Sequence, residues 1–124
     1  MTNGWEESAK AWMATLGPDG DFARRFVLDQ PMLARVQWSG ARSVLDVGCG
    51  EGRFCRLLAA GGVDTTGIDP AGSLIGEAMR LHPGGDYRVA SAERLPFDDE
   101  AFDLVVAYLS LIDIPDLEAA IREM

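Results

Sequence analysis

The hydrophobic residues change their spacing near residue 40, and this change divides the chain into two parts. Before it, apolar side chains recur at helical spacing, at Trp5, Ala9, Trp12, Met13 and Leu16. A turn over residues 17–20 ends this segment, and a second helical stretch follows. Pro31 is expected to open another short helix, because its missing N–H costs nothing in a first turn. Residues 1–38 are therefore predicted to form a helical leader.

From residue 39 onward, short apolar runs alternate with helical segments. The predicted strands lie at residues 43–47, 63–68, 87–90 and 102–108, with helices at 54–62, 74–81 and 117–124. The order β-α-β-α-β-loop-β-α favours a parallel sheet with right-handed crossovers. The strands are nearly continuous apolar runs, as expected when both faces are covered. We predict an α/β domain over residues 39–124, with a Rossmann-like parallel sheet and helices on both faces.

The fourth predicted strand is the most hydrophobic of the set, so we expect it to be central. Only one helical segment follows it in the sequence. An unpaired edge on such a strand invites pairing with another chain. We therefore expect that the chain is truncated, or that two copies pair through this strand as a homodimer.

Composition narrows the possible partners. The net charge of −9 argues against nucleic acid, whose binding proteins usually carry a basic face. The longest apolar stretch, residues 104–112, is too short to span a bilayer as a helix, and no signal peptide opens the chain. Cys49 and Cys55 are expected to be reduced thiols of a cytoplasmic protein. With a single distant histidine, His82, no metal site is expected.

A glycine-rich turn follows the first predicted strand, at residues 46–52 (D-V-G-C-G-E-G). Glycines at Gly48 and Gly50, around Cys49, let backbone approach a ligand and permit positive φ. The dinucleotide-binding fingerprint G-x-G-x-x-G would need a third glycine where the chain has Arg53. A strand-to-helix turn without a ligand is the alternative interpretation.

Asp69 and Pro70 end the second predicted strand. A carboxylate at this position can accept hydrogen bonds from both hydroxyls of a ribose. The alternative is that Asp69 acts as an N-cap for the following helix. In open parallel sheets, ligands bind at the carboxyl ends of the strands, where this carboxylate and the glycine turn would meet.

A third block makes the sequence resemble a known family. Residues 91–105 (S-A-E-R-L-P-F-D-D-E-A-F-D-L-V) are similar to the A-E-x-L-P-F-x-x-x-x-F-D-x-V stretch of ubiquinone-biosynthesis-type small-molecule methyltransferases. The glycine turn fits the h-D-h-G-x-G-x-G motif, where h is apolar, of these class I S-adenosylmethionine-dependent enzymes. The resemblance runs from about Arg42 to the end of the chain.

The resemblance implies S-adenosylmethionine as cofactor, S-adenosylhomocysteine as product and a small-molecule methyl acceptor. Asp46 would organise the methionine end of the cofactor, directly or through water. Backbone of the turn, including Gly48, Cys49 and Gly50, would approach that end, and Asp69 with Pro70 would hold the ribose. The positions that would border the adenine are Ser91, Ala92 and Glu93. Many relatives carry an aspartate where this chain has Ser91.

The family's complete sheet has the strand order 3-2-1-4-5-7-6, so this chain would supply strands 3-2-1-4 and lack the C-terminal strands. On this basis the chain would be the cofactor-binding half of the enzyme and catalytically poor alone. A non-catalytic module that binds the cofactor or its product is the alternative, and an NAD-binding oxidoreductase domain is a third.

No residue can be named as a catalytic base from the sequence. Tyr108 is a candidate wall of the methyl-transfer site or a core aromatic, and Asp113 is a candidate substrate-facing base or a helix cap. Trp12 and Phe26 of the leader would either cover the cofactor or close one end of the sheet.

Overall fold

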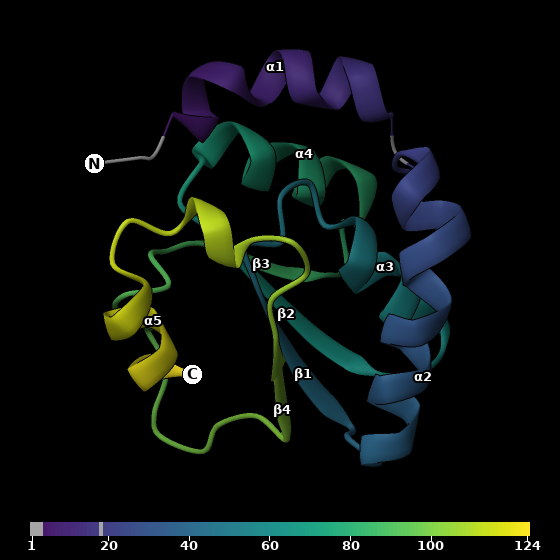
Figure 1. The fold of residues 1–124 in the computed structure, drawn as a ribbon, viewed down its shortest axis with the longest axis vertical. Coiled ribbons are helices and arrows are strands. Elements are labelled where there is room, and N and C mark those ends of the chain that lie inside the picture. Colours follow the sequence, from purple (N-terminus) through teal and green to yellow (C-terminus); the bar gives the residue numbers. More distant parts are fainter. Residues whose placement is uncertain (1–3, 18) are drawn as a thin grey trace.

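The computed structural model describes residues 4–17 and 19–124, and these contain one four-stranded parallel sheet (Figure 1). Its strands are β1 (Ser43–Val47), β2 (Asp64–Asp69), β3 (Asp86–Val89) and β4 (Leu104–Val106). The spatial order is β3-β2-β1-β4, and every neighbouring pair is parallel. The Rossmann-like sheet and the order 3-2-1-4 are therefore confirmed.

Helices precede, connect and follow the strands. They are α1 (Trp5–Leu16), the π-helix η1 (Arg24–Leu28), α2 (Asp29–Ser39), α3 (Arg53–Ala60), α4 (Gly72–Leu81), the 3-10 helix η2 (Leu111–Asp113) and α5 (Leu117–Glu123). α2 begins at Asp29, directly after η1, so the prediction that Pro31 opens a helix is wrong, because the chain is already helical before it. The part of the predicted leader at residues 1–3 and Pro18 lies outside the described residues.

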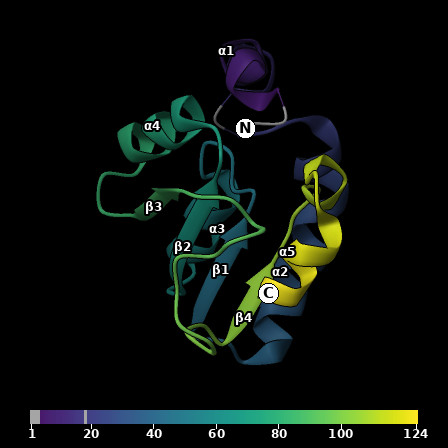
Figure 2. The same cartoon turned by 90° about the vertical axis from the view of Figure 1, so that its left-hand side faces the viewer.

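Alternate side chains of β1 face two different cores. Val44 packs with Val36, Phe54 and Leu58 of α2 and α3. On the other face, Leu45 and Val47 pack with a second cluster, Ile68, Ala92 and Ala120. Figures 1 and 2 show α2 and α3 on one side of the sheet and α5 on the other. Val44 to Val47 of the strand are buried because helices cover both of its faces.

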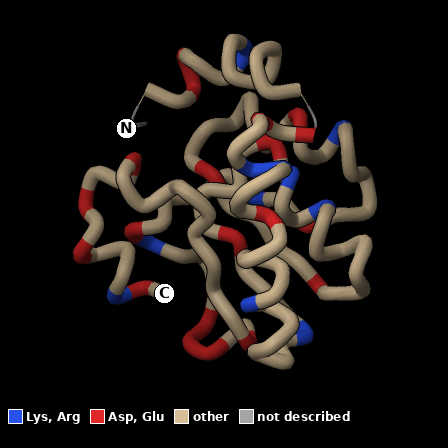
Figure 3. Tube along the Cα trace, turned by 45° about the vertical axis from the view of Figure 1, so that its right-hand side comes forward, with Lys and Arg blue, Asp and Glu red and all other residues tan. Residues whose placement is uncertain are grey.

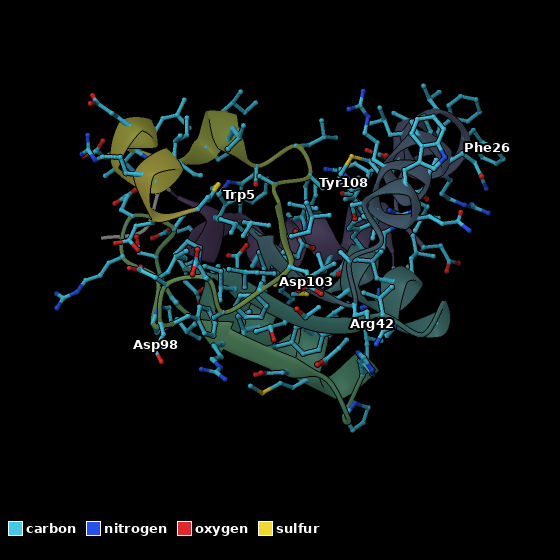
Figure 4. All side chains as sticks on the ribbon, turned by 90° about the horizontal axis from the view of Figure 1, so that it is seen from below. Trp5, Phe26, Arg42, Asp98, Asp103 and Tyr108 are labelled. Carbon is cyan, nitrogen blue, oxygen red and sulfur yellow. The ribbon has the colours of Figure 1, made fainter. Side chains whose placement is uncertain are left out.

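β4 lies at an edge of the described sheet, as the order 3-2-1-4 requires, and its central place in a complete sheet with further strands stays a prediction. It is only three residues long and half-buried, and β1 is its neighbour in the sheet. The central position belongs to β1, which pairs with both β2 and β4. Asp103, just before β4, aligns the starts of β4 and β1 by accepting hydrogen bonds from the backbone N–H groups of Arg42 (2.9 Å) and Ser43 (3.2 Å) (Figure 4).

α1 lies beside α4 at one end of the sheet, as the two ribbon views agree (Figures 1 and 2). Ala9 packs against Ala71 and Leu74 there. Glu6 accepts hydrogen bonds from the Ser73 hydroxyl at 2.6 Å and from its backbone N–H. Because that N–H opens a helix, the Glu6 carboxylate also meets the positive end of the α4 dipole. Polar and apolar contacts therefore fasten α1 to the same helix.

Acidic residues outnumber basic ones along the whole trace and gather in one loop (Figure 3). This loop contains Asp98, Asp99 and Glu100, all exposed, as expected for a solvated turn. Within residues 4–17 and 19–124, no helix has the length and apolar character needed to cross a bilayer.

A buried ion pair joins the leader to the first residue of α3, Arg53. Arg53 Nη1 donates to Asp29 Oδ1 at 3.0 Å, and Nη2 donates to Oδ2 of the same carboxylate. Arg53 Nε also donates to the carbonyl of Asp19 at 2.6 Å, and the Tyr108 hydroxyl donates to Asp29 Oδ1 at 2.8 Å. Burial raises the pKa of Asp29, but the hydrogen bonds from Arg53 and Tyr108 outweigh it, and the net pKa lies below its ordinary value.

Removal of the guanidinium should therefore destabilise the fold. Arg53→Met is expected to lower the free energy of unfolding by about 3 kcal/mol, because it leaves a carboxylate buried without its cation. Urea unfolding followed by circular dichroism measures the change. The double variant Asp29→Leu/Arg53→Met should recover part of the loss, since neither charge is then buried. As a control, Arg80→Gln breaks only an exposed pair and should leave the midpoint unchanged. Equal midpoints for Arg53→Met and the unaltered chain would contradict the prediction.

Candidate functional site

A cavity of about 480 Å³ opens where the strands end. Its floor comes from the carboxyl ends of β1 and β2, and one wall comes from the segment after β4. Residues of α1 close it from above. Side chains and backbone from five parts of the chain line it, among them Trp5, Trp12, Gly48, Gly50, Asp69, Ser91, Tyr108, Ser110 and Asp113. This is the position at which open parallel sheets bind ligands.

Two glycines of the turn have positive φ angles, which favour glycine over other residues. Gly48 has φ 77°, and a Cβ there would lie 2.4 Å from the Cβ of Ser110. Gly50 has φ 59°, and a Cβ there would meet no atom within 4 Å. Gly48 therefore lets the segment after β4 approach the turn, while Gly50 exposes its backbone to open space. Both glycines line the cavity.

Asp69 connects the two strand ends below the cavity. Its Oδ2 accepts a hydrogen bond from the N–H of Gly50 at 3.0 Å, and its Oδ1 accepts one from the N–H of Ala71 at 2.9 Å. The N-cap of α4 is Ala71, so the alternative interpretation of Asp69 as that N-cap is wrong. Burial raises the pKa of Asp69, and these backbone donors oppose the shift. Pro70, the next residue, also lines the cavity.

Asp46 and Cys49 lie behind the turn and do not line the large cavity. Asp46 is only 2% exposed, its Oδ2 lies 3.7 Å from the Cys55 Sγ, and its Oδ1 has no hydrogen-bond partner. Burial raises the pKa of Asp46 to about 7, and the nearby carboxylates of Asp69 and Glu51 add to the shift. Asp46 and Cys49 line a second, smaller cavity of about 70 Å³, which shares Trp12, Gly48, Gly50 and Tyr108 with the first.

The segment after β3 forms another wall of the large cavity. Ser91, Ala92 and Glu93 all line it, and the Ser91 hydroxyl accepts a hydrogen bond from the N–H of Glu93 at 3.1 Å. Glu93 Oε1 accepts a hydrogen bond from the N–H of Asp116 at 3.3 Å. The structure therefore places these three predicted residues on the same cavity as the glycine turn. Ala92 also packs into the core.

Tyr108 and Asp113 both line the large cavity, but their surroundings differ. The Tyr108 ring packs edge-on against Phe54, with centroids 4.9 Å apart. Burial, together with its hydrogen bond to Asp29, raises the pKa of Tyr108 to about 12, so its hydroxyl stays protonated near neutral pH. Asp113 belongs to η2, while the cap of α5 is Asp116, which accepts a hydrogen bond from the N–H of Ala119. Asp113 is therefore not that cap.

The two aromatic residues considered as a lid have different outcomes. Trp12 lines both cavities, next to the edge of the Trp5 ring. Phe26 is 65% exposed and points outward from the leader (Figure 4), so its interpretation as a lid is wrong. Phe26 stacks on Phe22 at the surface, away from the strand ends.

Sequence reasoning missed Arg24 and Ser110. Arg24 lines both cavities, and its guanidinium lies 5.1 Å from the centre of the Trp12 ring. Ser110 donates a hydrogen bond to the carbonyl of Val47 at 2.7 Å and contacts the turn. No motif marks either residue, because each reaches the site through the way the chain folds. No cluster of three or more potential metal-ligating side chains occurs in the described part of the chain.

The parallel sheet, with a glycine turn after its first strand and a carboxylate at the end of its second, defines the class of Rossmann-like α/β domains. Comparison with known proteins identifies the family within that class. The family model described as "Methyltransferase domain" matches residues 45–124. This chain belongs to that methyltransferase family.

Relatives and solved structures agree with this assignment. Ubiquinone biosynthesis O-methyltransferase of Xanthomonas axonopodis pv. citri is 43% identical over 95 residues, which cover 72% of this chain and 39% of that protein. Malonyl-[acyl-carrier protein] O-methyltransferase of Erwinia billingiae is 35% identical over 83 residues, which cover 67% of this chain and 33% of that protein. The chain therefore spans between 33% and 39% of the length of these relatives.

One solved structure covers nearly the whole chain. The crystal structure of magnesium protoporphyrin IX methyltransferase from Synechocystis PCC 6803 with bound SAM matches with a TM-score of 0.71 and 22% identity, over 98% of this chain and 67% of that one. At this identity the match concerns the fold alone.

The buried Asp46 should make stability depend on pH. Its carboxyl binds a proton more tightly in the folded chain, at a pKa of about 7, than at its ordinary value of 3.8. Its contribution to stability is therefore present below pH 3.8 and is lost as the pH rises through about 7. Asp46→Asn cannot ionise, so at pH 8 the variant should be more stable than the unaltered chain by about 3 kcal/mol.

Thermal unfolding at pH 5 and pH 8 measures this difference, which should shrink at the lower pH. Asp98→Asn, in the exposed acidic loop, is the matched control and should show no such dependence. An Asp46→Asn variant that is less stable than the unaltered chain at pH 8 would show that the ionised carboxylate is favourable in place.

Proposed function

We propose that this chain is the cofactor-binding half of an S-adenosylmethionine-dependent methyltransferase that acts on a small molecule. The observation that carries the proposal is the hydrogen bond from Gly50 N–H to Asp69, which sets the glycine turn and a ribose-binding carboxylate side by side on one cavity. The names of the relatives, both O-methyltransferases, support an oxygen as the accepting atom.

The cavity residues fit the three parts of this cofactor. Asp69 keeps lone pairs beyond its two backbone contacts, so its oxygens can also accept from ribose hydroxyls. Ser91, Ala92 and Glu93 offer a mixed polar and apolar wall for the adenine. The exposed backbone of Gly50 leaves room for the amino-acid end of the cofactor. A residue with a side chain would be strained at φ 59° and would fill part of this open space. A volume of about 480 Å³ is in the range of cofactor sites.

The bound cofactor would supply a methyl group on a sulfonium sulfur, which an acceptor atom takes by displacement. Such transfers depend on alignment and exclusion of water more than on acid–base chemistry. Trp5 and Trp12 cover the cavity from α1, and Tyr108 forms a wall. With a pKa of about 12, Tyr108 is suited to hold its proton and unsuited to act as a base. Asp113 is the carboxylate on this wall that can accept a proton from an acceptor hydroxyl.

Two other functions are alternatives. A non-catalytic module would bind the same cofactor or its product S-adenosylhomocysteine in the same cavity. An NAD-binding domain is disfavoured because Arg53 stands where the dinucleotide fingerprint has glycine, and its guanidinium is committed to Asp29.

The division of the chain, its location and its assembly complete the proposal. Residues 1–38 would act as a leader and residues 39–124 as the cofactor-binding domain. A cytoplasmic location agrees with two free, buried thiols, at Cys49 and Cys55. Pairing of two copies through β4 would use the strand edge that faces away from β1, and no nucleic-acid partner is expected at a net charge of −9.

Calorimetric titration with S-adenosylmethionine, S-adenosylhomocysteine and NAD tests the function. The two sulfur nucleosides should bind and NAD should not. Asp69→Asn should weaken both by about 10-fold or more, because a carboxylate accepts ribose hydroxyls more strongly than an amide does. Asp64→Asn is the matched control, since it lies at the exposed opposite end of β2 and should leave affinity unchanged. Binding of NAD alone would overturn the proposal.

A further inference from the structure

A packed group of aromatic and basic side chains lies on the outer surface of the leader. The rings of Phe22 and Phe26 pack on each other with centroids 4.8 Å apart, although the two residues are 73% and 65% exposed. The Arg25 guanidinium lies 5.2 Å from the centre of the Phe26 ring, and the next residue along, Val27, is also exposed. We call these four residues the leader patch. Single exposed apolar residues are common, but a packed group of them marks an interaction surface.

The leader patch is basic in a chain that is acidic as a whole. Within residues 22–40 the one acidic residue, Asp29, is buried against Arg53, while Arg25 and Arg35 are exposed. The net charge of the whole chain is −9. Aromatic residues and arginine are enriched where proteins bind each other, and a basic patch is matched by an acidic one. The leader patch therefore fits an apolar surface that is bordered by carboxylates.

Such a surface occurs on the same chain, around η2 and α5. Ile112 of η2 is 92% exposed, and Leu117 and Ile121 of α5 are also exposed. Leu117 and Ile121 stand four residues apart, so they share one face of the helix. Residues 109–124 contain four acidic side chains and one arginine, and Figure 3 shows the acidic colour along this last part of the chain. We call Ile112, Leu117, Glu118 and Ile121 the α5 face.

The leader patch and the α5 face of one copy cannot reach each other. α2 and α5 lie on opposite sides of the sheet (Figures 1 and 2), and Phe26 points outward on the side away from α5 (Figure 4). Two copies of the chain can bring these surfaces together. Because the two surfaces differ and face apart, the contact would be heterologous, and copies would add head to tail.

We propose that the leader patch of one copy docks on the α5 face of a second copy. The phenyl rings of Phe22 and Phe26 would cover exposed apolar side chains of η2 and α5, and Arg25 would meet the carboxylates there. The inference goes beyond the proposed function and does not rest on it. Pairing through β4 would use the same strand edge on both copies, so it is a different mode of assembly.

The contact would also change the large cavity. Leu109 and Ile112 line this cavity and are both exposed. A second copy seated on Ile112 would cover part of the wall that follows β4 and would bring its own aromatic rings to that wall. The neighbouring copy would therefore contribute side chains to the surroundings of the cavity and reduce the access of water to it.

Sedimentation velocity of the whole chain over a range of protein concentrations tests the proposal. The unaltered chain should associate as its concentration rises, and the complexes should grow past the dimer. Phe22→Ser/Phe26→Ser lacks the leader patch and Ile112→Ser/Ile121→Ser lacks the α5 face, so each variant alone should stay monomeric at those concentrations. Mixed together, they should form a complex of one copy of each that grows no further, because one intact surface remains on each copy.

Two further variants separate the charge of the leader patch from general loss of apolar surface. Arg25→Glu keeps both aromatic rings and should weaken association by about 10-fold, since a like charge then faces the carboxylates of the α5 face. Met79→Ser/Val89→Ser removes two exposed apolar side chains outside both surfaces, so it should associate as the unaltered chain does. Circular dichroism of every variant checks that the fold is retained.

An unaltered chain that stays monomeric at all concentrations would overturn the proposal, and so would a mixture of the two double variants that forms no complex. Association of both double variants by themselves would also overturn it and would point to pairing through β4. Association of Ile112→Ser/Ile121→Ser alone would show that two leader patches bind each other instead. Cofactor titration is a separate measurement, so failure of the proposed function would leave this result unchanged.

Discussion

The hydrogen bond from the Gly50 N–H to the Asp69 carboxylate is the contact on which the site depends. It joins the turn after β1 to the end of β2, two positions that the parallel register brings to one edge of the sheet. Asp69 also accepts from Ala71, so one side chain sets the glycine turn and the start of α4 together. The glycine turn after β1 and the start of α4 after β2 border the cavity at the strand ends. The Asp69 carboxylate fixes the distance between them.

The fold was predictable because its signals are local. Alternating apolar runs and helical segments predict the parallel sheet, and the glycine turn with Asp69 predicts where ligand-binding groups converge. The edge position of β4 follows from the predicted order 3-2-1-4, in which β1 takes the buried place between two neighbours. Arg24 escaped prediction because an arginine in a leader looks like any surface charge until packing brings it to the cavity. Asp46 does not line the large cavity because neighbouring side chains of a strand point to opposite faces, and Val47 takes the face on the cavity side.

Three buried carboxyl groups, whose burial is energetically costly, lie around the glycine turn. Asp46, Glu51 and Asp69 are all buried carboxyl groups, and burial raises the pKa of each. Asp46 Oδ1 has no hydrogen-bond partner, which is costly in a protein interior. Such groups are rarely kept for stability, and they cluster around the glycine turn that lines the candidate site.

The contacts that hold the leader have a consequence for synthesis of the chain. Glu6 binds Ser73, 67 residues later in the sequence, and Asp29 binds Arg53, 24 residues later. The leader therefore emerges from the ribosome before either of its partners exists. Contacts of long sequence separation form slowly. The leader would therefore be among the last parts of the described fold to dock, and until then Trp5 and Trp12 stay exposed to solvent.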